Sequence, residues 1–168
     1  MNAPQLETER LRLRPLAVDD AAFVLELVND AAFLEHIGDK RVRDLDDARR
    51  FLREGAWVRQ PLPGHGMLAV EPRAGGAPLG VCGLLHRPAL GLSDVGFAFL
   101  AAQRGRGYAS EAAAAIVRHA REALGLARVH GIVSPANPAS IRVLEKLGMS
   151  LLRRVRLVEG EDEVLLFG

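Results

Sequence analysis

A glycine- and arginine-rich turn at residues 103–111, with the sequence QRGRGYASE, is the stretch of this chain best suited to chemistry. It joins an apolar run at 95–100 to an alanine-rich helical pattern at 109–124. Gly105 and Gly107 allow the backbone to turn tightly and to approach a ligand closely. Because the turn opens directly into a helix, several free N–H groups and the positive end of the helix dipole face the same point.

An anion is the ligand that such a turn favours, most naturally a phosphate or a pyrophosphate. Arg104 and Arg106 add two permanent charges. The turn does not end in a GK[ST] sequence, so a nucleoside-triphosphate P-loop is not expected. A Rossmann fingerprint would need a third glycine where this chain has Ser110, and an earlier position in the fold. Taken alone, the turn could also be a plain strand-to-helix connection.

A second segment, at 137–149, has the sequence NPASIRVLEKLGM. Asn137 and Pro138 predict the N-cap and the first turn of a helix, and Gly148 lies where that helix should end. Three apolar residues would form its buried face, namely Ile141, Leu144 and Leu147. Considered by itself, this segment is explained by helix formation alone.

The histidines and the single cysteine do not form a ligand set. No metal-ligand spacing relates one histidine to another or to Cys82, and the histidines are His36, His65, His86, His119 and His130. No metal site is therefore expected. Cys82 lies in an apolar strand pattern without a residue that would activate it, so we do not expect it to act as a nucleophile.

Composition places the chain among ordinary globular proteins. It has 168 residues, 49% of them hydrophobic and 26% charged, which is enough for one domain with a real core. The 22 basic and 21 acidic residues nearly balance, and this argues against a dedicated nucleic-acid binder. The start lacks the pattern of a signal peptide, and no apolar run reaches membrane-spanning length. With a single cysteine as well, a soluble, cytoplasmic protein is expected.

Periodicity and turn residues predict a strand, two helices and three strands, followed by a helix, a strand, a helix and two strands. The expected elements are a strand around Leu11 and Leu13, a helix capped by Asp19 that extends to Val28, a helix at 45–58, strands at 67–71, 79–85 and 94–100, a helix at 109–124, a strand at 129–133, a helix from 138 to about 147, and a hairpin of 151–158 with 164–167. This order predicts a mixed sheet covered by helices, with a β–α–β unit centred on the glycine turn.

Together, the two segments resemble the cofactor motifs of the Gcn5-related N-acetyltransferase (GNAT) superfamily. The turn at 104–109 is similar to that family's [QR]xxGx[GA] loop for the acetyl-CoA pyrophosphate. Asn137 and Ser140, in the pattern NxxS followed by LEKLG, are similar to its second CoA-contacting segment. The opening ETERLRLRPL at 7–16 and the GYASE form of the loop resemble the RimJ/RimL type, which acetylates the N-termini of ribosomal proteins. The resemblance spans essentially the whole chain.

The resemblance implies an α/β (α+β) fold: a mixed, mostly antiparallel central sheet of about six or seven strands flanked by about four helices. Acetyl-CoA would bind at a splayed pair of strands next to the glycine loop. Residues 1–168 would form a single N-acetyltransferase domain.

The resemblance also implies which residues contact acetyl-CoA. Loop amides, including those of Gly105, Gly107 and Ala109, would hold the pyrophosphate. The strand before the loop would pair its backbone with the pantetheine arm, Asn137 would contact the same arm, and Ser140 would lie near the thiol. The expected cofactor contacts are Phe99, Leu100, Arg104, Gly105, Arg106, Gly107, Tyr108, Ala109, Ser110, Asn137 and Ser140.

The catalytic groups are less clearly marked. Many family members carry a tyrosine acid in the helix after the NxxS pattern, and Leu144 occupies that position here. Ser140 could protonate the leaving thiolate instead, or the thiolate could leave unassisted. Asp94, near the start of the strand before the loop, is the nearest carboxylate that could act as the general base; it could equally be a solvated or turn-capping residue.

The expected function is direct transfer of an acetyl group from acetyl-CoA to a primary amine. The acceptor would be a protein N-terminus, such as that of a ribosomal protein, or a small-molecule amine. Its specificity would come from the regions at 33–64 and 153–162. A non-catalytic acyl-CoA-binding sensor or regulatory module is the alternative. No nucleic acid or membrane partner is expected, and the chain could be a monomer or a homodimer.

Overall fold

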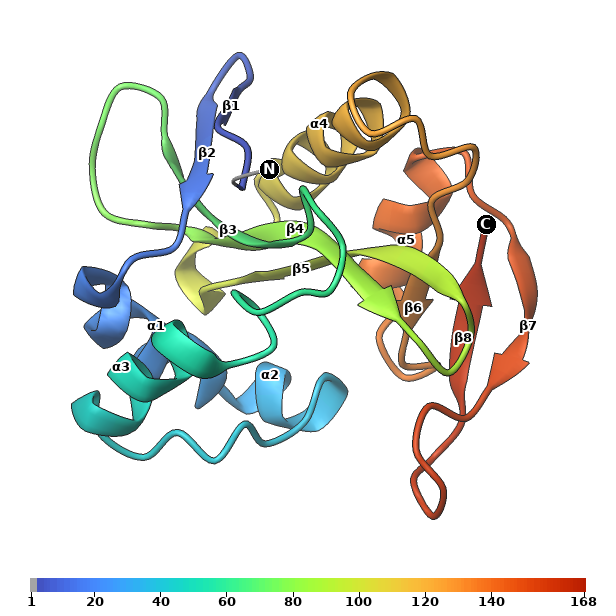
Figure 1. The fold of residues 1–168 in the computed structure, drawn as a ribbon, viewed down its shortest axis with the longest axis horizontal. Coiled ribbons are helices and arrows are strands. Elements are labelled where there is room, and N and C mark those ends of the chain that lie inside the picture. Colours follow the sequence, from blue (N-terminus) through green and yellow to red (C-terminus); the bar gives the residue numbers. More distant parts are fainter. Residues whose placement is uncertain (1–2) are drawn as a thin grey trace.

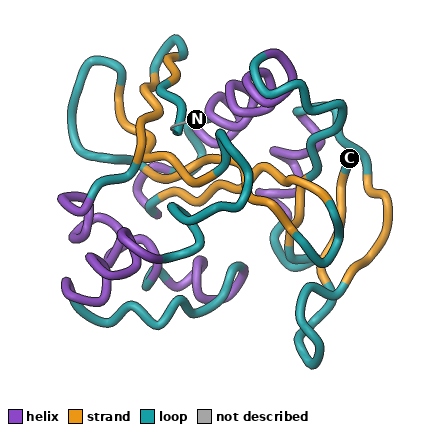
Figure 2. Tube along the Cα trace, viewed as in Figure 1, coloured by secondary structure: helices purple, strands orange, loops and turns teal. Residues whose placement is uncertain are grey.

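The computed structural model describes residues 3–168 and divides the strands between two sheets (Figures 1 and 2). The larger sheet is antiparallel in the order β1-β2-β3-β4-β5, and its strands are β1 (Leu6–Glu7), β2 (Leu11–Pro15), β3 (Gly66–Pro72), β4 (Gly80–Arg87) and β5 (Leu92–Phe99). The smaller sheet has the order β6-β8-β7 and consists of β6 (Gly131–Val133), β7 (Leu151–Val155) and β8 (Val164–Phe167).

Helices cover both faces of the larger sheet (Figure 1). They are α1 (Ala21–Val28), α2 (Ala31–His36), α3 (Leu45–Glu54), α4 (Tyr108–Glu122) and α5 (Pro138–Lys146), with short 3-10 turns at Val18–Asp20 and Ala101–Gln103. The first three lie on one face, and α4 lies on the other. None of the helices in the described part of the chain is long and apolar enough to span a membrane.

Each face of the sheet has its own hydrophobic core. Leu11 and Leu13 of β2 are fully buried beneath α4, together with Ile116 of that helix. On the opposite face, Val24 and Leu27 of α1 are fully buried in a cluster with residues of α3, β3 and β4. Each such side chain contributes about 1.5–3 kcal/mol when it is removed from water. The alternation of β2 therefore positions the start of the chain firmly against α4.

Within the described residues, one isolated bridge of backbone hydrogen bonds connects the two sheets. Asp94 of β5 and His130, just before β6, form a parallel bridge. The Val95 amide donates to the His130 carbonyl at 2.9 Å, and the His130 amide donates to the Ser93 carbonyl at 3.0 Å. Beyond this point no pairing joins β5 to β6, so the two parallel strands separate toward their carboxyl ends.

The fold class predicted from the sequence is confirmed: the fold is mixed α/β, the sheets are largely antiparallel, and a β–α–β unit contains the glycine turn. Among the described residues the strands number eight, because the short β1 adds to the seven that were expected.

Three local predictions were wrong. Asp19 does not cap α1; it lies within a 3-10 turn, and the α-helix begins at Ala21. The helix predicted for 45–58 ends at Glu54, because Gly55 adopts an extended conformation. The pattern analysis also missed α2, which has only six residues.

Candidate active site

A cavity of about 520 Å³ lies beside the carboxyl end of β5. The glycine turn and the first turn of α4 form one wall, α5 forms another, and α2 forms a third. The lining residues are Ala32, Phe33 and His36 of α2 with its C-cap Ile37, residues 97–99 of β5, residues 103–105 and 107–110 of the turn and α4, and the N-cap Asn137 with residues 138–140, 142, 143 and 146 of α5. The two segments singled out in the sequence therefore share one cavity.

The glycine turn presents free amides to this cavity. Gly105 and Gly107 have φ values of +76° and +81°, which favour glycine. Gly107 is the N-cap of α4. The backbone N–H groups of residues 107–110 have no hydrogen-bond partner within residues 3–168. With the positive end of the helix dipole, four free donors on the wall of a cavity form a site for an anion.

The two predicted arginines are placed differently. Arg104 lines the cavity, and its Nε donates to the carbonyl of Phe99 at 3.1 Å. Its Nη2 also bonds to the Asp30 carboxylate at 2.5 Å. Arg106 is not among the cavity-lining residues. Arg104 therefore supplies a charge at the cavity and at the same time ties the loop to α2.

The backbone of β5 faces the gap between the sheets. Because N–H groups of alternate residues in a strand point to the same side, those of Phe97 and Phe99 point to the same edge as that of Val95. The Val95 amide is bonded to His130, whereas Phe97 and Phe99 lie beyond the last paired residue and line the cavity. A ligand at this edge can pair with the strand. Leu100 lies outside the cavity lining, and its amide donates to the Leu79 carbonyl at 3.0 Å.

The N-terminus of α5 borders the other side of the gap. The Oδ1 atom of Asn137 accepts from the Ser140 amide at 3.2 Å, which confirms Asn137 as the N-cap. Both residues line the cavity. Leu144 faces the core instead: it is 1% exposed, and its side chain lies where a Cβ atom on Gly131 would be only 2.5 Å away.

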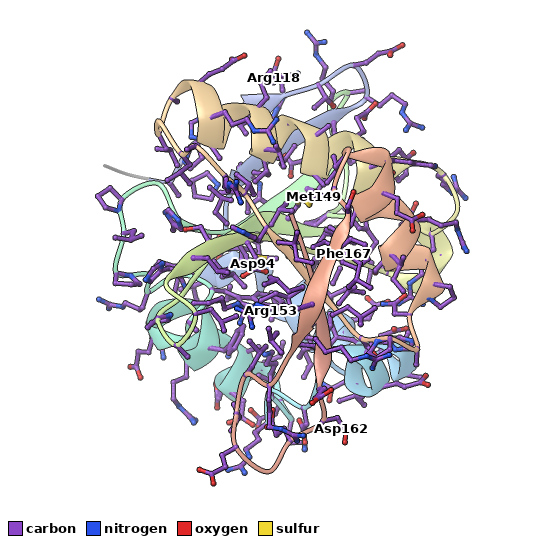
Figure 3. All side chains as sticks on the ribbon, turned by 90° about the vertical axis from the view of Figure 1, so that its right-hand side faces the viewer. Asp94, Arg118, Met149, Arg153, Asp162 and Phe167 are labelled. Carbon is purple, nitrogen blue, oxygen red and sulfur yellow. The ribbon has the colours of Figure 1, made fainter. Side chains whose placement is uncertain are left out.

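Asp94 is not among the residues that line the cavity. It is 1% exposed, and its Oδ1 accepts from Nε of Arg87 at 2.6 Å. Burial raises the pKa of Asp94, and the Arg87 charge opposes that rise. Figure 3 shows Asp94 toward the centre of the molecule, far from Asp162 in the loop between β7 and β8. Of the two side chains predicted to act in catalysis, only Ser140 lies on the cavity wall.

No residue of the α2 wall was predicted to contact the cofactor or to act in catalysis, although Phe33, His36 and Ile37 lie within the region 33–64 that was expected to select the acceptor. His36 lines the cavity, and its Nδ1 is buried without a hydrogen-bond partner among the described residues. Asp30 was the signal that could have revealed this helix: its carboxylate accepts from the amides of Ala32 and Phe33, as an N-cap should. The helix is short, and its position at the cavity depends on contacts that are distant in sequence.

Cys82 is fully buried in β4, and burial raises the pKa of its thiol. It does not line the cavity and is unsuited to act as a nucleophile. Within residues 3–168, no group of three or more histidine, cysteine, aspartate or glutamate residues is placed to hold a metal ion.

Comparison with known proteins identifies relatives across the chain. Residues 10–150 match the family model described as "Acetyltransferase (GNAT) domain". YkkB, an uncharacterized protein of Bacillus subtilis (strain 168), is 30% identical over 162 residues, covering 93% of this chain and 91% of that protein.

Solved structures share the same architecture. An acetyltransferase from Agrobacterium tumefaciens str. C58 superposes with a TM-score of 0.82 at 29% identity, covering 99% of this chain and 94% of that one. A Vibrio cholerae protein proposed to be a ribosomal-protein-serine acetyltransferase has a structure with a TM-score of 0.77 at 20% identity, covering 99% of this chain and 98% of that one.

Proposed function

Because this chain belongs to the GNAT acetyltransferase family and is therefore an acetyltransferase, we propose that it moves an acetyl group from acetyl-CoA, bound in the 520 Å³ cavity, to a primary amine. The observation that carries this proposal is the set of free amides at residues 107–110, which open onto the cavity. An anionic cofactor with an extended arm suits a cavity that joins an anion site to an unpaired strand edge.

The proposed placement follows the walls of the cavity. The pyrophosphate lies against the amides of the glycine turn, with Arg104 contributing charge. The pantetheine arm runs along β5 and pairs with the backbone of Phe97 and Phe99. Asn137 and Ser140 border the arm from the side of α5, which places Ser140 near the thiol. Gly105 lines the cavity beside these amides.

The chemistry is direct transfer within a ternary complex. A neutral amine nitrogen attacks the thioester carbon, the C–S bond breaks, and the electron pair leaves on the CoA sulfur. The amine proton goes to solvent or to a nearby base, and the thiolate takes a proton from Ser140 or from water. No covalent enzyme intermediate is involved, which agrees with the burial of Cys82. Most of the rate enhancement comes from holding the amine against the thioester.

The acceptor is a protein N-terminus, such as that of a ribosomal protein, or a small-molecule amine. The fold shared with the Vibrio cholerae structure supports the first class, and a cavity bounded by α2 can take either. A cytoplasmic location belongs to the same proposal, because a free cysteine is typical of a reducing compartment.

The test measures release of free CoA thiol from acetyl-CoA in the presence of primary amines, with mass spectrometry of the products. N-terminal peptides of ribosomal proteins, polyamines and amino acids form the panel. Thiol release with an equal yield of N-acetylated amine is the expected result. Tight binding of acetyl-CoA without acetylation of any amine would instead indicate a CoA-binding module.

A further inference from the structure

Arg10, in the turn between β1 and β2, contacts the glycine loop and does not line the cavity. We propose that Arg10 is a positioning residue, which holds the loop so that the amides of 107–110 face the cofactor pyrophosphate. This inference rests on the proposed function. It comes from contacts between residues that are 96 and 101 positions apart in the sequence, and neither of the two cofactor motifs, at 104–109 and 137–148, contains Arg10.

The Arg10 guanidinium joins three parts of the loop. Nη1 donates to the carbonyl of Arg106 at 3.0 Å, and Nε donates to Oε1 of Glu111 at 3.2 Å. The Cζ atom lies 4.6 Å from the centre of the Tyr108 ring, at cation–π distance. A planar group with several donors in fixed directions can make these contacts together, and an ammonium cannot.

The bond to the Arg106 carbonyl determines where the next amide points. In a trans peptide the carbonyl of one residue and the N–H of the following residue point in opposite directions. Holding the Arg106 carbonyl toward Arg10 therefore turns the Gly107 N–H away from Arg10. Gly107 lines the cavity, whereas Arg10 and Arg106 do not.

Arg10 also lies close to Gly107, the N-cap of α4. A Cβ atom on Gly107 would lie 3.3 Å from Nη2 of Arg10, and the φ value of +81° disfavours any side chain there. The left-handed φ value is the main reason for a glycine at this position, and the guanidinium would have to shift by a few tenths of an ångström to admit a side chain.

Arg10 also forms an ion pair with Glu111. This carboxylate lies in the first turn of α4, where it would repel an anionic ligand. Arg10 pairs with one of its oxygens, and the Thr8 hydroxyl donates to the other at 3.1 Å. Glu111 is not a lining residue of the cavity. The pair thus holds the negative charge outside the anion site and partly neutralises it.

Stability should depend little on this ion pair. The Arg10 side chain is 44% exposed, and exposed pairs of this kind contribute little to folding. Removing Arg10 should therefore impair the loop while the protein stays folded. Arg12, two residues further along, is a matched control, because it carries the same charge and its ion pairs are with Glu7 and Glu71.

The experiment follows amide chemical shifts of the full-length protein by NMR during titration with CoA and, separately, with pantetheine, which lacks the pyrophosphate and the nucleotide. Arg10→Ala should weaken CoA binding by about 10- to 100-fold, as expected when bonds to a charged group are lost, and should leave pantetheine binding unchanged. Arg12→Ala should change neither. Arg10→Lys should lie between wild type and Arg10→Ala, because lysine keeps only the charge.

CoA binding by Arg10→Ala as tight as in the wild type would overturn the inference. Equal weakening of CoA and pantetheine would overturn it as well, since the effect would then not be confined to the pyrophosphate. A wild-type protein that binds no CoA would overturn the proposed function together with this inference, and that result is distinct from a failure of Arg10 alone.

Discussion

Asn137 has two tasks in one side chain, since it caps α5 and borders the proposed path of the pantetheine arm. Asn137→Ala should lower the free energy of unfolding by about 1 kcal/mol, because the bond to the Ser140 amide is lost. It should also raise the KM for acetyl-CoA. Asn137→Ser should keep most of the cap and show the cofactor defect alone. Urea denaturation and steady-state kinetics measure the two effects separately.

If Asn137→Ser matched the wild type in stability and in KM, Asn137 would be a helix cap without a cofactor contact.

Ser140 tests how far catalysis depends on a side-chain acid. A positioned acid typically contributes about 10²–10⁴-fold, and the tyrosine position of the family holds the buried Leu144. Since a thiolate is a good leaving group, Ser140→Ala should slow turnover by at most about 100-fold, at the low end of that range. Turnover is measured across pH 6 to 9 with an acceptor found by the thiol assay.

A loss greater than about 10⁴-fold in Ser140→Ala, with acetyl-CoA binding intact, would show that the acid is obligatory and would contradict the positioning account.

For single residues, the sequence predicts a role when the interaction partner is only a few positions away in the chain. Asn137 could be identified as a cap because its partner is three residues away. Arg10 belongs to the opening segment at 7–16, but its role could not be identified, because its partners Arg106 and Glu111 lie 96 and 101 residues away in the sequence. Asp94 shows the same limit: its ion pair with Arg87 depends on the register of two strands.

Among the elements, α2 connects the cavity wall to the glycine loop through one carboxylate. Asp30 caps α2 and bonds to Arg104. Burial acts to raise the pKa of Asp30, but the bond from Arg104, the amides of Phe33 and Ala32, and the Arg104 charge outweigh it, so the pKa lies below its usual value of 3.8. A carboxylate whose pKa is lowered by folding stabilises the folded state at pH values above its unfolded-state pKa. This stabilisation is lost as the pH falls through the folded-state pKa.

Asp30→Asn should therefore be less stable than the wild type at pH 7, by about 1 kcal/mol, because the charge is lost while the cap can remain. The difference should shrink as pH falls below 3.8, where the carboxylate of the unfolded chain binds a proton first, and it should vanish once the folded carboxylate, whose pKa is lower, is protonated as well. Denaturant titrations at pH 7, 5, 4 and 3 measure it. A stability difference that stayed constant down to pH 3 would contradict the ion pair.

Asp44→Asn is the matched control, because Asp44 caps α3 by accepting from the Asp47 amide. Only Asp30→Asn should weaken CoA binding, since Arg104 would lose its partner beside the loop.

Elements with long, regular patterns could be predicted from the sequence. The alternation of β2 and the alanine-rich face of α4 fixed both elements to within a residue or two. The six-residue α2 has too few residues for a period to be recognised, and the two-residue β1 owes its existence to pairing with β2. The end of α3 depended on the backbone conformation of Gly55, which hydrophobic periodicity does not report.

For the whole molecule, the cavity lies where β5 and β6 separate. The sequence predicted a β–α–β unit, and the resemblance to a family predicted a splayed strand pair. Where the strands separate could be located only in the structure, because the last contact, between Asp94 and His130, joins segments remote in sequence. The third wall, from α2, likewise follows from packing across the sheet.

The central claim is that the glycine turn binds the pyrophosphate of acetyl-CoA. Two glycines of similar conformation, one in the turn and one outside it, provide a test and a matched control. Gly105 in the loop and Gly125 after α4 have φ values of +76° and +67°, and an added Cβ would meet no atom within 4 Å at either position. Gly105→Ala and Gly125→Ala should therefore lose similar stability, about 1–2 kcal/mol from the left-handed backbone.

Calorimetric titration of the wild type and both variants with acetyl-CoA is the most direct test. The account predicts micromolar binding by the wild type and by Gly125→Ala, and binding weaker by at least about 10-fold in Gly105→Ala, where the side chain and the altered backbone disturb the amides that hold the pyrophosphate. Equal affinity in all three folded proteins, or no binding by the wild type, would contradict it.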